Sequence, residues 1–509
     1  MRPDPRRVWS RRAGFGIIQG MKQMLAPVLV AACLRCGAAP LPLVPWPADV
    51  RSREGSAPAS VPVSDVRDAS LGAEEYRLSV SPEGVTVASS GAAGAFYARK
   101  TLDQLRRPDG SLPCVEISDR PRFAWRGVLI DESRHFFGKD VVKRVIDRMA
   151  QFKLNVLHWH LVDSHGWRLQ IDRYPELTAR GAVRPVPDWD RHVRDEDGSG
   201  EYGPYFYTKA EVRDIIAYAA ARHVKIVPEI ELPGHSREVI LCHPGFSCLP
   251  WSRFAEMMRT SGKYDQAGAL CLGNDEVIRF LENVFDEVCE LFPGDTVHIG
   301  GDECPRGNWK ECPKCQARIA ALGLKGEDAL QSWATGHFVD YLAKKGRKAI
   351  GWDEILQGGL AEGALVMSWR GAEGGIAAAR AGHQVVMCPH TYCYLDYPTG
   401  EKDDECAYPG FCAKSFLPLE KVYSLNPCAG LSEEYSRFVL GSQSLNWAES
   451  TWNESMLQFK MWPRTCASAE VLWTGPGVRD FGDFKARLRP VCARMVREGV
   501  NMTGSVVSE

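Results

Sequence analysis

Two adjacent carboxylic acids, Asp302 and Glu303, follow the short run Thr296-Val-His-Ile-Gly-Gly. Neighbouring side chains on a regular strand point to opposite faces, so these two acids can share one ligand only where a strand breaks into its loop. The two glycines allow such a bend and leave space beside the backbone. A pair of carboxyl groups can cleave a glycosidic bond, because one protonates the leaving oxygen while negative charge supports the sugar carbon C1. Two exposed loop acids would give the same local pattern.

After residue 121, short apolar runs alternate with longer amphipathic segments. Eight such runs are Trp125–Asp131, Val156–Asp163, Lys225–Glu231, Thr296–Glu303, Ala349–Glu354, Leu365–Trp369, Gln384–His390 and Val439–Glu449. Strands that alternate with helices predict βαβ units and a parallel sheet, and eight of them fit a (β/α)₈ barrel over residues 121–509. A doubly wound sheet is the alternative, but no Gly-rich phosphate turn follows the first run.

The runs end in polar or aromatic residues, and this is where a barrel builds its active site. The residues at or just after the run ends are Asp131, Arg134, Asp163, Glu229, Glu231, Asp302, Glu303, Trp352, Asp353, Glu354, Trp369, His390, Trp447 and Glu449. Because a barrel gathers the C-terminal ends of its strands on one face, we expect these residues to converge on one binding cleft.

A small α+β domain is predicted before the barrel, over residues 41–120. Tyr76–Val80 and residues 84–88 alternate like two strands joined by a turn, and residues 91–105 have helical spacing. The stretch from Pro42 to Ser70 is rich in Pro, Ala and Ser, which predicts a linker or a loosely held lead-in.

Residues 1–40 are predicted to be an export segment. Five arginines precede a short apolar run, Met24 to Leu34, which has the length of a signal-peptide core and is too short to span a bilayer. Val30-Ala-Ala-Cys33 resembles a bacterial lipobox, which would place a lipid anchor on Cys33, and Ala38-Ala39 offers a plain cleavage site instead. The chain is therefore expected in the periplasm, on the outer membrane as a lipoprotein, or outside the cell.

The net charge and the cysteines bear on which ligands the chain could bind. The formal net charge is −2, so no basic surface points to nucleic acid. In an exported chain, the neighbouring cysteines Cys242/Cys248 and Cys304/Cys312/Cys315 are candidate loop disulfides. Cys312-Pro-Lys-Cys315 has half of a zinc-site spacing, but no second Cys pair or His follows at the partner spacing. The sequence therefore predicts neither a metal nor a cofactor.

Several segments together resemble one enzyme family. His298-Ile-Gly-Gly-Asp-Glu303 is similar to the signature of glycoside hydrolase family 20, the β-N-acetylhexosaminidases. Segments similar to the first, second, third and fifth barrel strands of that family follow in order: Arg126–Phe137, Asn155–Arg168, Pro228–His235 and Gly351–Glu354. The similarity extends from Ser70 to Trp473.

The resemblance implies an exo-acting, retaining hydrolase that removes terminal non-reducing β-linked N-acetylglucosamine or N-acetylgalactosamine. In this family the substrate's own acetamido oxygen attacks C1 and forms an oxazolinium ion. By position, Glu303 is expected to be the general acid/base. Asp302 is expected to hydrogen-bond the acetamido N–H, and Tyr394 the acetamido oxygen.

The resemblance also implies the residues around this pair. The tryptophans expected to wall the sugar pocket are Trp352, Trp369 and Trp447. The residues expected to bind hydroxyls are Arg134, Asp396 and Glu449. Those expected behind them are Asp163, His235 and His298, where Asp163 and His235 would tune Glu303, which must be protonated to start the cycle. A pair of Arg134 with Asp131 alone, a turn role for His235 and core packing for Trp447 stay open, and Glu354 is expected to be structural.

Other readings and departures from the family pattern remain. The N-terminal domain is short for the family, so its first strands are absent or replaced by the stretch from Pro42 to Ser70. The segment from Thr391 to Cys412 is expected to be a loop specific to this chain. Alternative functions are a lacto-N-biosidase-like enzyme that releases a disaccharide, a catalytically silent sugar-binding protein, and a barrel hydrolase with Glu449 or Asp353 as nucleophile.

Overall fold

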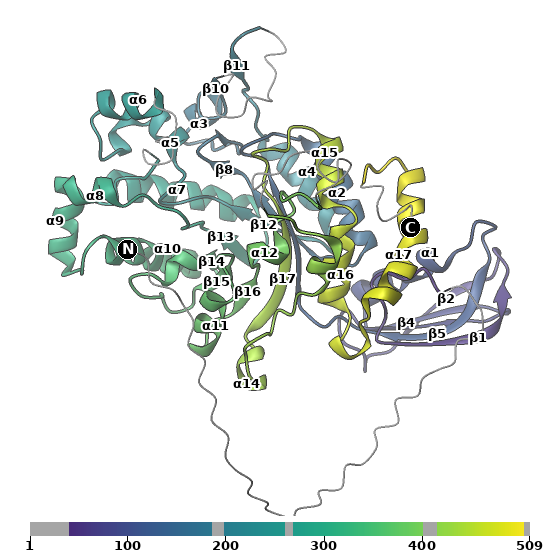
Figure 1. Cartoon of the computed structure of the whole chain (residues 1–509). Helices are drawn as coiled ribbons and strands as arrows, with labels where there is room; N and C mark the ends of the chain where they lie inside the picture. The colour runs from purple at the N-terminus through teal and green to yellow at the C-terminus, as the bar shows by residue number, and fades with distance from the viewer. Residues whose placement is uncertain (1–39, 186–197, 260–267, 401–414, 503–509) are drawn as a thin grey trace, which may run out of the picture. The chain divides into compact units, whose positions relative to one another are not determined.

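The computed structural model describes residues 40–185, 198–259, 268–400 and 415–502 (Figure 1). The compact unit that begins at Leu41 contains two hydrophobic cores, a large one in and around a barrel and a smaller one under an N-terminal sheet. The predicted export segment lies outside the described residues. Within the described parts of the chain, every helix is too short or too polar to cross a membrane.

Eight parallel strands close into a barrel in the order β12-β13-β14-β15-β16-β17-β6-β7. Each predicted run supplies one strand: β6 (Trp125–Asp131), β7 (Val156–His160), β12 (Lys225–Glu229), β13 (Thr296–His298), β14 (Lys348–Trp352), β15 (Leu365–Ser368), β16 (Val385–Met387) and β17 (Val439–Asn446). The predicted α/β class, a (β/α)₈ barrel after a small α+β domain, is confirmed.

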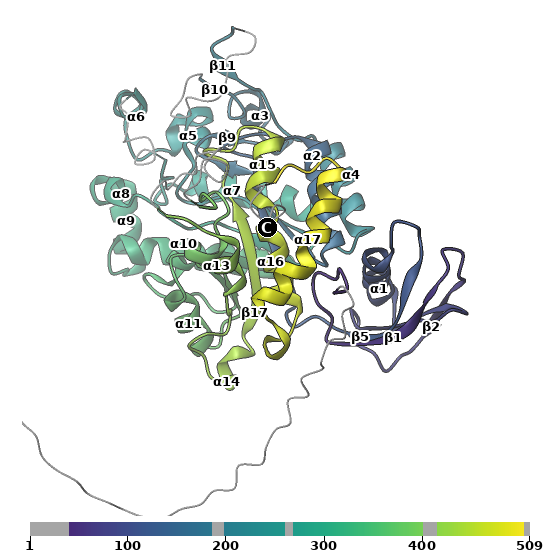
Figure 2. The same ribbon diagram turned by 45° about the vertical axis from the view of Figure 1, so that its right-hand side comes forward.

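Amphipathic helices cover the outside of the barrel (Figures 1 and 2). The longer ones are α2 (Lys139–Gln151), α4 (Lys209–Ala220), α7 (Asp275–Leu291), α10 (Glu327–Lys344), α11 (Glu373–Arg380), α16 (Arg464–Trp473) and α17 (Phe481–Arg497). Three of these helices, α4, α7 and α17, begin with a side-chain cap. Thr208 and Glu211 form a capping box on α4, and the Asn274 side chain accepts a hydrogen bond from the Glu276 backbone N–H on α7.

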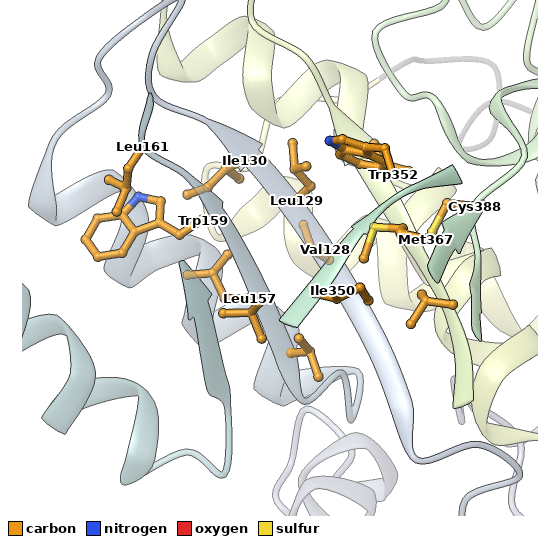
Figure 3. Packing of buried hydrophobic residues seen from close by; sticks show 14 of the residues in the cluster. Val128, Leu129, Ile130, Leu157, Trp159, Leu161, Ile350, Trp352, Met367 and Cys388 are labelled. Atoms are coloured by element: carbon orange, nitrogen blue, oxygen red, sulfur yellow. The ribbon is translucent and has the colours of Figure 1, made fainter. Parts of the chain in front are cut away.

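Alternation along the strands separates a polar interior from an apolar outer layer. Trp159 on β7 and Leu161 just after this strand point outward, away from Trp352 and Met367 (Figure 3). Trp159 packs edge-on to Phe292 beside α7. The intervening residue, His160, is buried inside the barrel. The strands therefore supply core packing with one set of side chains and site chemistry with the other.

Short elements fill the loops that follow the strands. They are β8 (Val162–Asp163), β9 (Gly166–Trp167), α3 (Glu176–Ala179), β10 (Arg184–Pro185), β11 (Glu201–Tyr202), α5 (Arg237–Cys242), η1 (Pro244–Phe246), α6 (Trp251–Arg259), α8 (Gly307–Glu311), α9 (Pro313–Leu322), η3 (Asp353–Leu356), α12 (His390–Cys393), α13 (Leu419–Tyr423), α14 (Glu433–Ser436), α15 (Glu454–Met461) and η4 (Pro476–Val478). The chain-specific loop predicted from Thr391 to Cys412 begins in α12, and its part after residue 400 lies outside the described residues.

The N-terminal domain is a five-stranded sheet in the order β1-β5-β3-β4-β2. Its elements are β1 (Asp49–Ala57), β2 (Val63–Arg67), β3 (Tyr76–Val80), β4 (Val85–Ser89), α1 (Ala92–Leu105) and β5 (Leu112–Asp119). The prediction of two strands and a helix between residues 76 and 105 is confirmed, and α1 lies on one face of the sheet (Figure 2).

The prediction of a linker from Pro42 to Ser70 is wrong. This stretch contains β1, which pairs antiparallel with β5, and β2, which pairs parallel with β4. Both are edge strands, and nearly all of their side chains are exposed. An edge strand without a buried face lacks the alternation of apolar residues by which strands are recognised, so backbone pairing carries these two instead.

The predicted loop disulfides are also wrong. Cys242 is a thiol whose sulfur lies 3.3 Å from the Glu176 carbonyl oxygen, and Cys304 is a buried thiol. Cys248, Cys312 and Cys315 are free thiols that cluster with Cys271, and the four sulfur atoms lie within 4.8 Å of one another. Proximity in sequence misled here, because the fold brings the loops after two different strands together.

A buried polar cluster joins the small domain to the barrel. Lys153, in the turn before β7, places its ammonium 2.8 Å from Asp119 Oδ2 and 2.9 Å from the Tyr76 hydroxyl. Trp473, at the end of α16, donates its indole N–H to Asp119 Oδ1 at 2.8 Å and packs edge-on to Tyr97 in the small core. Asp119 therefore balances a buried cation that comes from the barrel.

We predict that Asp119→Ala lowers the free energy of unfolding by about 3–5 kcal/mol, because it leaves the Lys153 ammonium buried without its counter-charge. Equilibrium urea unfolding measures this change. The control is Asp65→Ala, which removes one partner of an exposed pair with Arg99 and is expected to change stability little. Equal losses in the two variants would contradict the role given to the buried cluster.

Candidate active site

The structure brings the predicted site residues together at the C-terminal end of the barrel strands. Arg134 follows β6, Asp163 lies in β8 after β7, His235 follows β12, Asp302 and Glu303 follow β13, Trp352 ends β14, Trp369 follows β15, Tyr394 and Asp396 follow β16 and α12, and Trp447 and Glu449 follow β17. His298 is the last residue of β13 and faces the barrel interior. The expected convergence is therefore observed.

The backbone leaves strand geometry just before the acid pair. Gly300 and Gly301 have φ values of 65° and 103°, and Glu303 itself has a φ of 45°. The Gly301 N–H donates to Glu231 Oε1 at 2.9 Å, and a Cβ atom on Gly300 would lie 1.9 Å from Glu231 Oε2. Only glycine leaves room for the Glu231 carboxyl group at this point, and the turn that follows lets two neighbouring acids reach one site.

His235 lies between three carboxylates of the site. Its Nδ1 is 3.4 Å from Asp163 Oδ1, and its Nε2 is 3.7 Å from Asp302 Oδ2 and 3.6 Å from Glu303 Oε2. Burial by itself lowers the pKa of His235, but the charges of Asp163 and Asp302 outweigh it and raise the pKa to about 10. His235 is therefore an imidazolium at neutral pH, and its cation faces the acid pair.

The two neighbouring acids have different surroundings. The Asp302 side chain is 16% exposed, whereas the Glu303 side chain is 59% exposed. Burial raises the pKa of Asp302, while the nearby His235 cation opposes this shift. Asp302 Oδ1 is buried and accepts no hydrogen bond from the described residues. A buried oxygen of this kind is stabilised by a ligand that donates a hydrogen bond, while Glu303 can meet a group that enters from solvent.

Arg134 joins several acids at the opposite side of the site. Its guanidinium nitrogens lie 3.2 Å from Asp131 Oδ2, 2.8 Å from Asp163 Oδ2 and 3.8 Å from Glu449 Oε1. The pair with Asp131, which the sequence left open as the whole role of Arg134, is formed, but Arg134 also contacts Asp163, Glu449 and His160. Arg134 also lies 5.2 Å from the centre of the Trp447 ring, so its position is fixed from several directions.

Aromatic rings from four loops meet beside the acid pair. Tyr394 stacks on Trp369 with ring centres 6.0 Å apart and an angle of 8°, and it meets Trp447 at 6.1 Å and 65°. Trp352 and Trp447 are 5.8 Å apart. Trp369 and Trp447 are only partly buried, so core packing is not their whole role. Aromatic faces of this kind suit the apolar C–H faces of a sugar ring.

Two further carboxyl groups lie near Arg134 and the aromatic rings. Burial and the charge of Glu449 raise the pKa of Asp396 to about 7, and burial also raises the pKa of Glu449. Asp396 Oδ1 and Glu449 Oε2 are buried without a hydrogen-bond partner among the described residues. Both oxygens are suited to accept hydrogen bonds from ligand hydroxyl groups.

Glu229 was expected at the end of a strand, but the role that it has beneath the site was not predicted. Glu229 Oε1 accepts the Trp352 indole N–H at 2.8 Å and lies 2.9 Å from His298 Nδ1. Glu229 Oε2 lies 3.1 Å from His158 Nε2 and also contacts His160 Nδ1. His298 thus acts on the site through Glu229 rather than by touching the acid pair. The available signal was the polar alternation of His158 and His160 within a buried strand.

Glu354 takes part in the site more directly than predicted. Its Oε2 accepts the Trp369 indole N–H at 3.0 Å, which positions that ring. Burial and the charge of Asp302 raise the pKa of Glu354 to about 8. Glu354 therefore supports an aromatic wall and senses the charge of the acid pair.

Sequence models assign both parts of the chain to one family. The model described as "Glycosyl hydrolase family 20, catalytic domain" matches residues 123–476, and "Glycosyl hydrolase family 20, domain 2" matches residues 43–120. The chain belongs to glycosyl hydrolase family 20. The predicted family, fold and enzyme class, a glycosidase, are confirmed.

Individual relatives agree with this assignment. The chain is 40% identical to a β-hexosaminidase of Porphyromonas gingivalis over 84% of its own length, but it spans only about half (54%) of that relative. A β-hexosaminidase of Akkermansia muciniphila is 32% identical and is matched over 88% of both chains. The solved structure of an exo β-N-acetylglucosaminidase from Vibrio harveyi, in complex with N-acetylglucosamine, is 30% identical, with a TM-score of 0.82 over 92% of this chain and 79% of that chain.

We predict that Gly300→Ala destabilises the protein while Gly307→Ala does not. Alanine at the positive φ of Gly300 costs about 1–2 kcal/mol, and its Cβ would also displace the Glu231 carboxyl group. Gly307 opens α8 shortly after the acid pair and has open space around it. Urea unfolding of both variants measures the difference. A Gly300→Ala variant as stable as Gly307→Ala would contradict the tight packing of Glu231 against this turn.

Proposed function

We propose that the protein is a β-N-acetylhexosaminidase that removes terminal non-reducing β-linked N-acetylhexosamine by a retaining, substrate-assisted mechanism. The observation that carries this proposal is the contrast between two sequence neighbours on one cation. Asp302 is buried with an unpartnered oxygen, whereas Glu303 is exposed, and both lie within 3.7 Å of His235 Nε2. One acid is placed to hold a group that stays, and the other to exchange a proton with a group that leaves.

The proposed reaction has two steps. In the first, the acetamido oxygen of the bound sugar attacks C1 while Glu303 gives its proton to the glycosidic oxygen, so that the bond to the leaving group breaks and an oxazolinium ion forms. Asp302 accepts the acetamido N–H and stabilises the positive charge, and the Tyr394 hydroxyl holds the acetamido oxygen. In the second, Glu303 takes a proton from water as the water attacks C1, which restores the acetamido group and retains the configuration.

Six further residues are proposed to surround the sugar. Trp352, Trp369 and Trp447 pack against its ring, and Arg134, Asp396 and Glu449 bind its hydroxyl groups. The terminal sugar favoured by the comparisons is N-acetylglucosamine, because the Vibrio harveyi structure holds that sugar. The proposed substrate is therefore a glycan with a terminal N-acetylglucosamine.

The contacts disfavour the alternatives. A protein nucleophile would have to be Glu449 or Asp353, yet Glu449 faces Arg134 and Asp353 Oδ1 accepts from Arg370 Nε at 2.8 Å. A silent sugar-binding protein would have no use for an exposed acid beside a buried imidazolium. The β-hexosaminidase relatives and the exo β-N-acetylglucosaminidase structure favour release of a single sugar over release of a disaccharide.

We predict that the protein hydrolyses a chromogenic β-N-acetylglucosaminide and leaves the matching β-glucoside intact, because glucose lacks the acetamido nucleophile. Glu303→Gln is expected to lower kcat by about 10²–10⁴-fold through loss of the general acid/base. Steady-state kinetics on both sugars measure these effects, and Glu362→Gln, which changes an exposed acid outside the site, serves as the control.

Other outcomes would identify the competing functions. Equal hydrolysis of both sugars would contradict substrate assistance and indicate a protein nucleophile. Inactivity on both, with release of lacto-N-biose from a disaccharide glycoside, would indicate the disaccharide-releasing enzyme. Binding of N-acetylglucosamine without turnover would indicate the silent sugar-binding protein.

We also propose that the chain is exported and anchored by a lipid on Cys33. The support is the arginine-rich start, the short apolar run from Met24 to Leu34 and the lipobox-like Val30-Ala-Ala-Cys33. Export would bring the enzyme to glycans outside the cytoplasm.

We predict that the full chain, made in a Gram-negative host, fractionates with membranes and partitions into detergent, whereas Cys33→Ala partitions into water with unchanged specific activity. A lipidated cysteine adds buried CH₂ groups that hold the chain at the bilayer, and alanine cannot carry them. Detergent phase separation with mass spectrometry of the N-terminus measures both. Water-soluble wild type cleaved near Ala38-Ala39 would contradict the anchor, and uncleaved protein in the cytoplasm would contradict export.

A further inference from the structure

Four cysteines from two loops converge on one point outside the active site. Cys248 and Cys271 come from the loop after β12, and Cys312 and Cys315 flank the start of α9 in the loop after β13. All four sulfur atoms lie within 4.8 Å of one another. Three of these cysteines are buried and Cys248 is half-buried.

The spacing of the sulfur atoms fits a bound ion better than disulfides. Cys271 Sγ is 3.6 Å from Cys312 Sγ and 3.7 Å from Cys315 Sγ, and Cys315 Sγ is also 3.7 Å from Cys248 Sγ. Four sulfurs placed tetrahedrally about 2.3 Å from a zinc ion are about 3.8 Å apart. A disulfide would bring two sulfurs to about 2.05 Å. Cys271 and Cys315 each approach two partners equally, which pairing into two disulfides does not require.

The backbone around the cluster is arranged to hold these sulfurs. An isolated bridge between Ser247 and Leu270 sets Cys248 beside Cys271, and the Cys271 N–H donates to the Phe246 carbonyl at 2.8 Å. The Gly273 backbone passes so close to the segment from Cys312 to Cys315 that a Cβ atom on Gly273 would lie 2.1 Å from the Lys314 carbonyl carbon.

We propose that Cys248, Cys271, Cys312 and Cys315 bind one structural zinc ion that ties the loop after β12 to the loop after β13. On binding, each thiol releases its proton to solvent, and four thiolates with Zn²⁺ leave a net charge of −2 at the site. Four protein ligands close the coordination sphere, so the ion has no open position for catalysis. This site replaces the expectation of no metal, which rested on the lack of partner cysteines at short spacing; the partners lie 41 to 67 residues away.

The two tied loops carry the acid–base residues of the active site. His235 lies in the loop after β12, and Leu270 in the same loop donates its N–H to the Pro233 carbonyl at 2.8 Å. Asp302 and Glu303 lie near the start of the loop after β13, which continues through α8 to Cys312 and Cys315. Trp309, buried in α8, donates its indole N–H to the Leu270 carbonyl at 3.0 Å. The zinc ion thus joins the two loops at a point outside the active site. Within the active site, the same two loops bring His235 and Glu303 face to face.

The first test is metal analysis of the full chain, purified without chelators or metal-affinity resin. Inductively coupled plasma mass spectrometry is expected to find about one zinc ion per chain. The Cys312→Ser/Cys315→Ser variant is expected to lose the zinc, whereas Cys428→Ser, which removes a half-buried cysteine outside the cluster, is expected to retain it. The wild-type measurement stands alone if the double variant does not fold, and native mass spectrometry checks it independently.

The second test measures how the zinc ion stabilises the two loops, independently of enzyme activity. Stripping zinc with a chelator is expected to lower the Tm and to speed amide hydrogen exchange in residues 268–274 and 304–316, with little change in the small N-terminal sheet. Readdition of Zn²⁺ is expected to restore both. These readouts do not depend on turnover, so an inactive enzyme with zinc bound would refute the proposed function and leave the metal site intact.

Three outcomes would overturn the metal site. A metal-free protein with the four cysteines joined in two disulfides, seen by mass spectrometry without reduction, would replace the ion by crosslinks. A metal-free protein with four reactive thiols would show an unligated cluster. Iron in place of zinc would overturn the assignment of the ion, since four thiolates also bind iron.

Discussion

One buried carboxylate, Glu229, holds the interior of the barrel mouth together. It accepts the Trp352 N–H and contacts His158, His160 and His298, so residues from three other strands meet on it. Burial alone would raise its pKa, but the three histidines lower it well below the usual value, while the pKa of His160 is raised well above its own. Removal of this charge would leave buried donors from three other strands unsatisfied, which the low-dielectric interior makes costly.

Charges of alternating sign lead from this carboxylate to the reacting pair. His160 Nε2 lies 3.0 Å from Asp163 Oδ2, and Asp163 in turn contacts Arg134 and His235, whose cation faces Asp302 and Glu303. Each charge is held by a partner on another loop, so the reacting groups are positioned by the barrel rather than by their own exposed segment. His235 and Glu303 both adopt positive φ, at 44° and 45°, and such backbone is kept only where its surroundings fix it.

The sequence predicted the barrel well because each strand buries apolar residues and ends in polar ones. The run predicted for β13 extended to Glu303, whereas the strand ends at His298. The two glycines turn the backbone before it reaches the acids. The edge strands β1 and β2 were not predicted, because exposed strands show no alternation of apolar residues. Glu229 was expected at a strand end, but its contacts with three histidines and Trp352, like the four-cysteine cluster, were not predicted. The residues involved are far apart in sequence, and only barrel closure and loop packing bring them together.

The acids of the site carry less charge than their number implies. Burial raises the pKa of Glu231 well above its usual value and that of Glu354 to about 8, and the charge of Asp302 contributes to both shifts. Glu354 is therefore largely protonated at neutral pH, and the shift at Glu231 favours its neutral form in the same direction. An oxazolinium ion carries positive charge close to its nitrogen, and the carboxylate nearest to it must be ionised to stabilise that charge. The His235 cation lowers the pKa of Asp302 against the effect of burial, and so favours the negative charge that the proposed intermediate requires there.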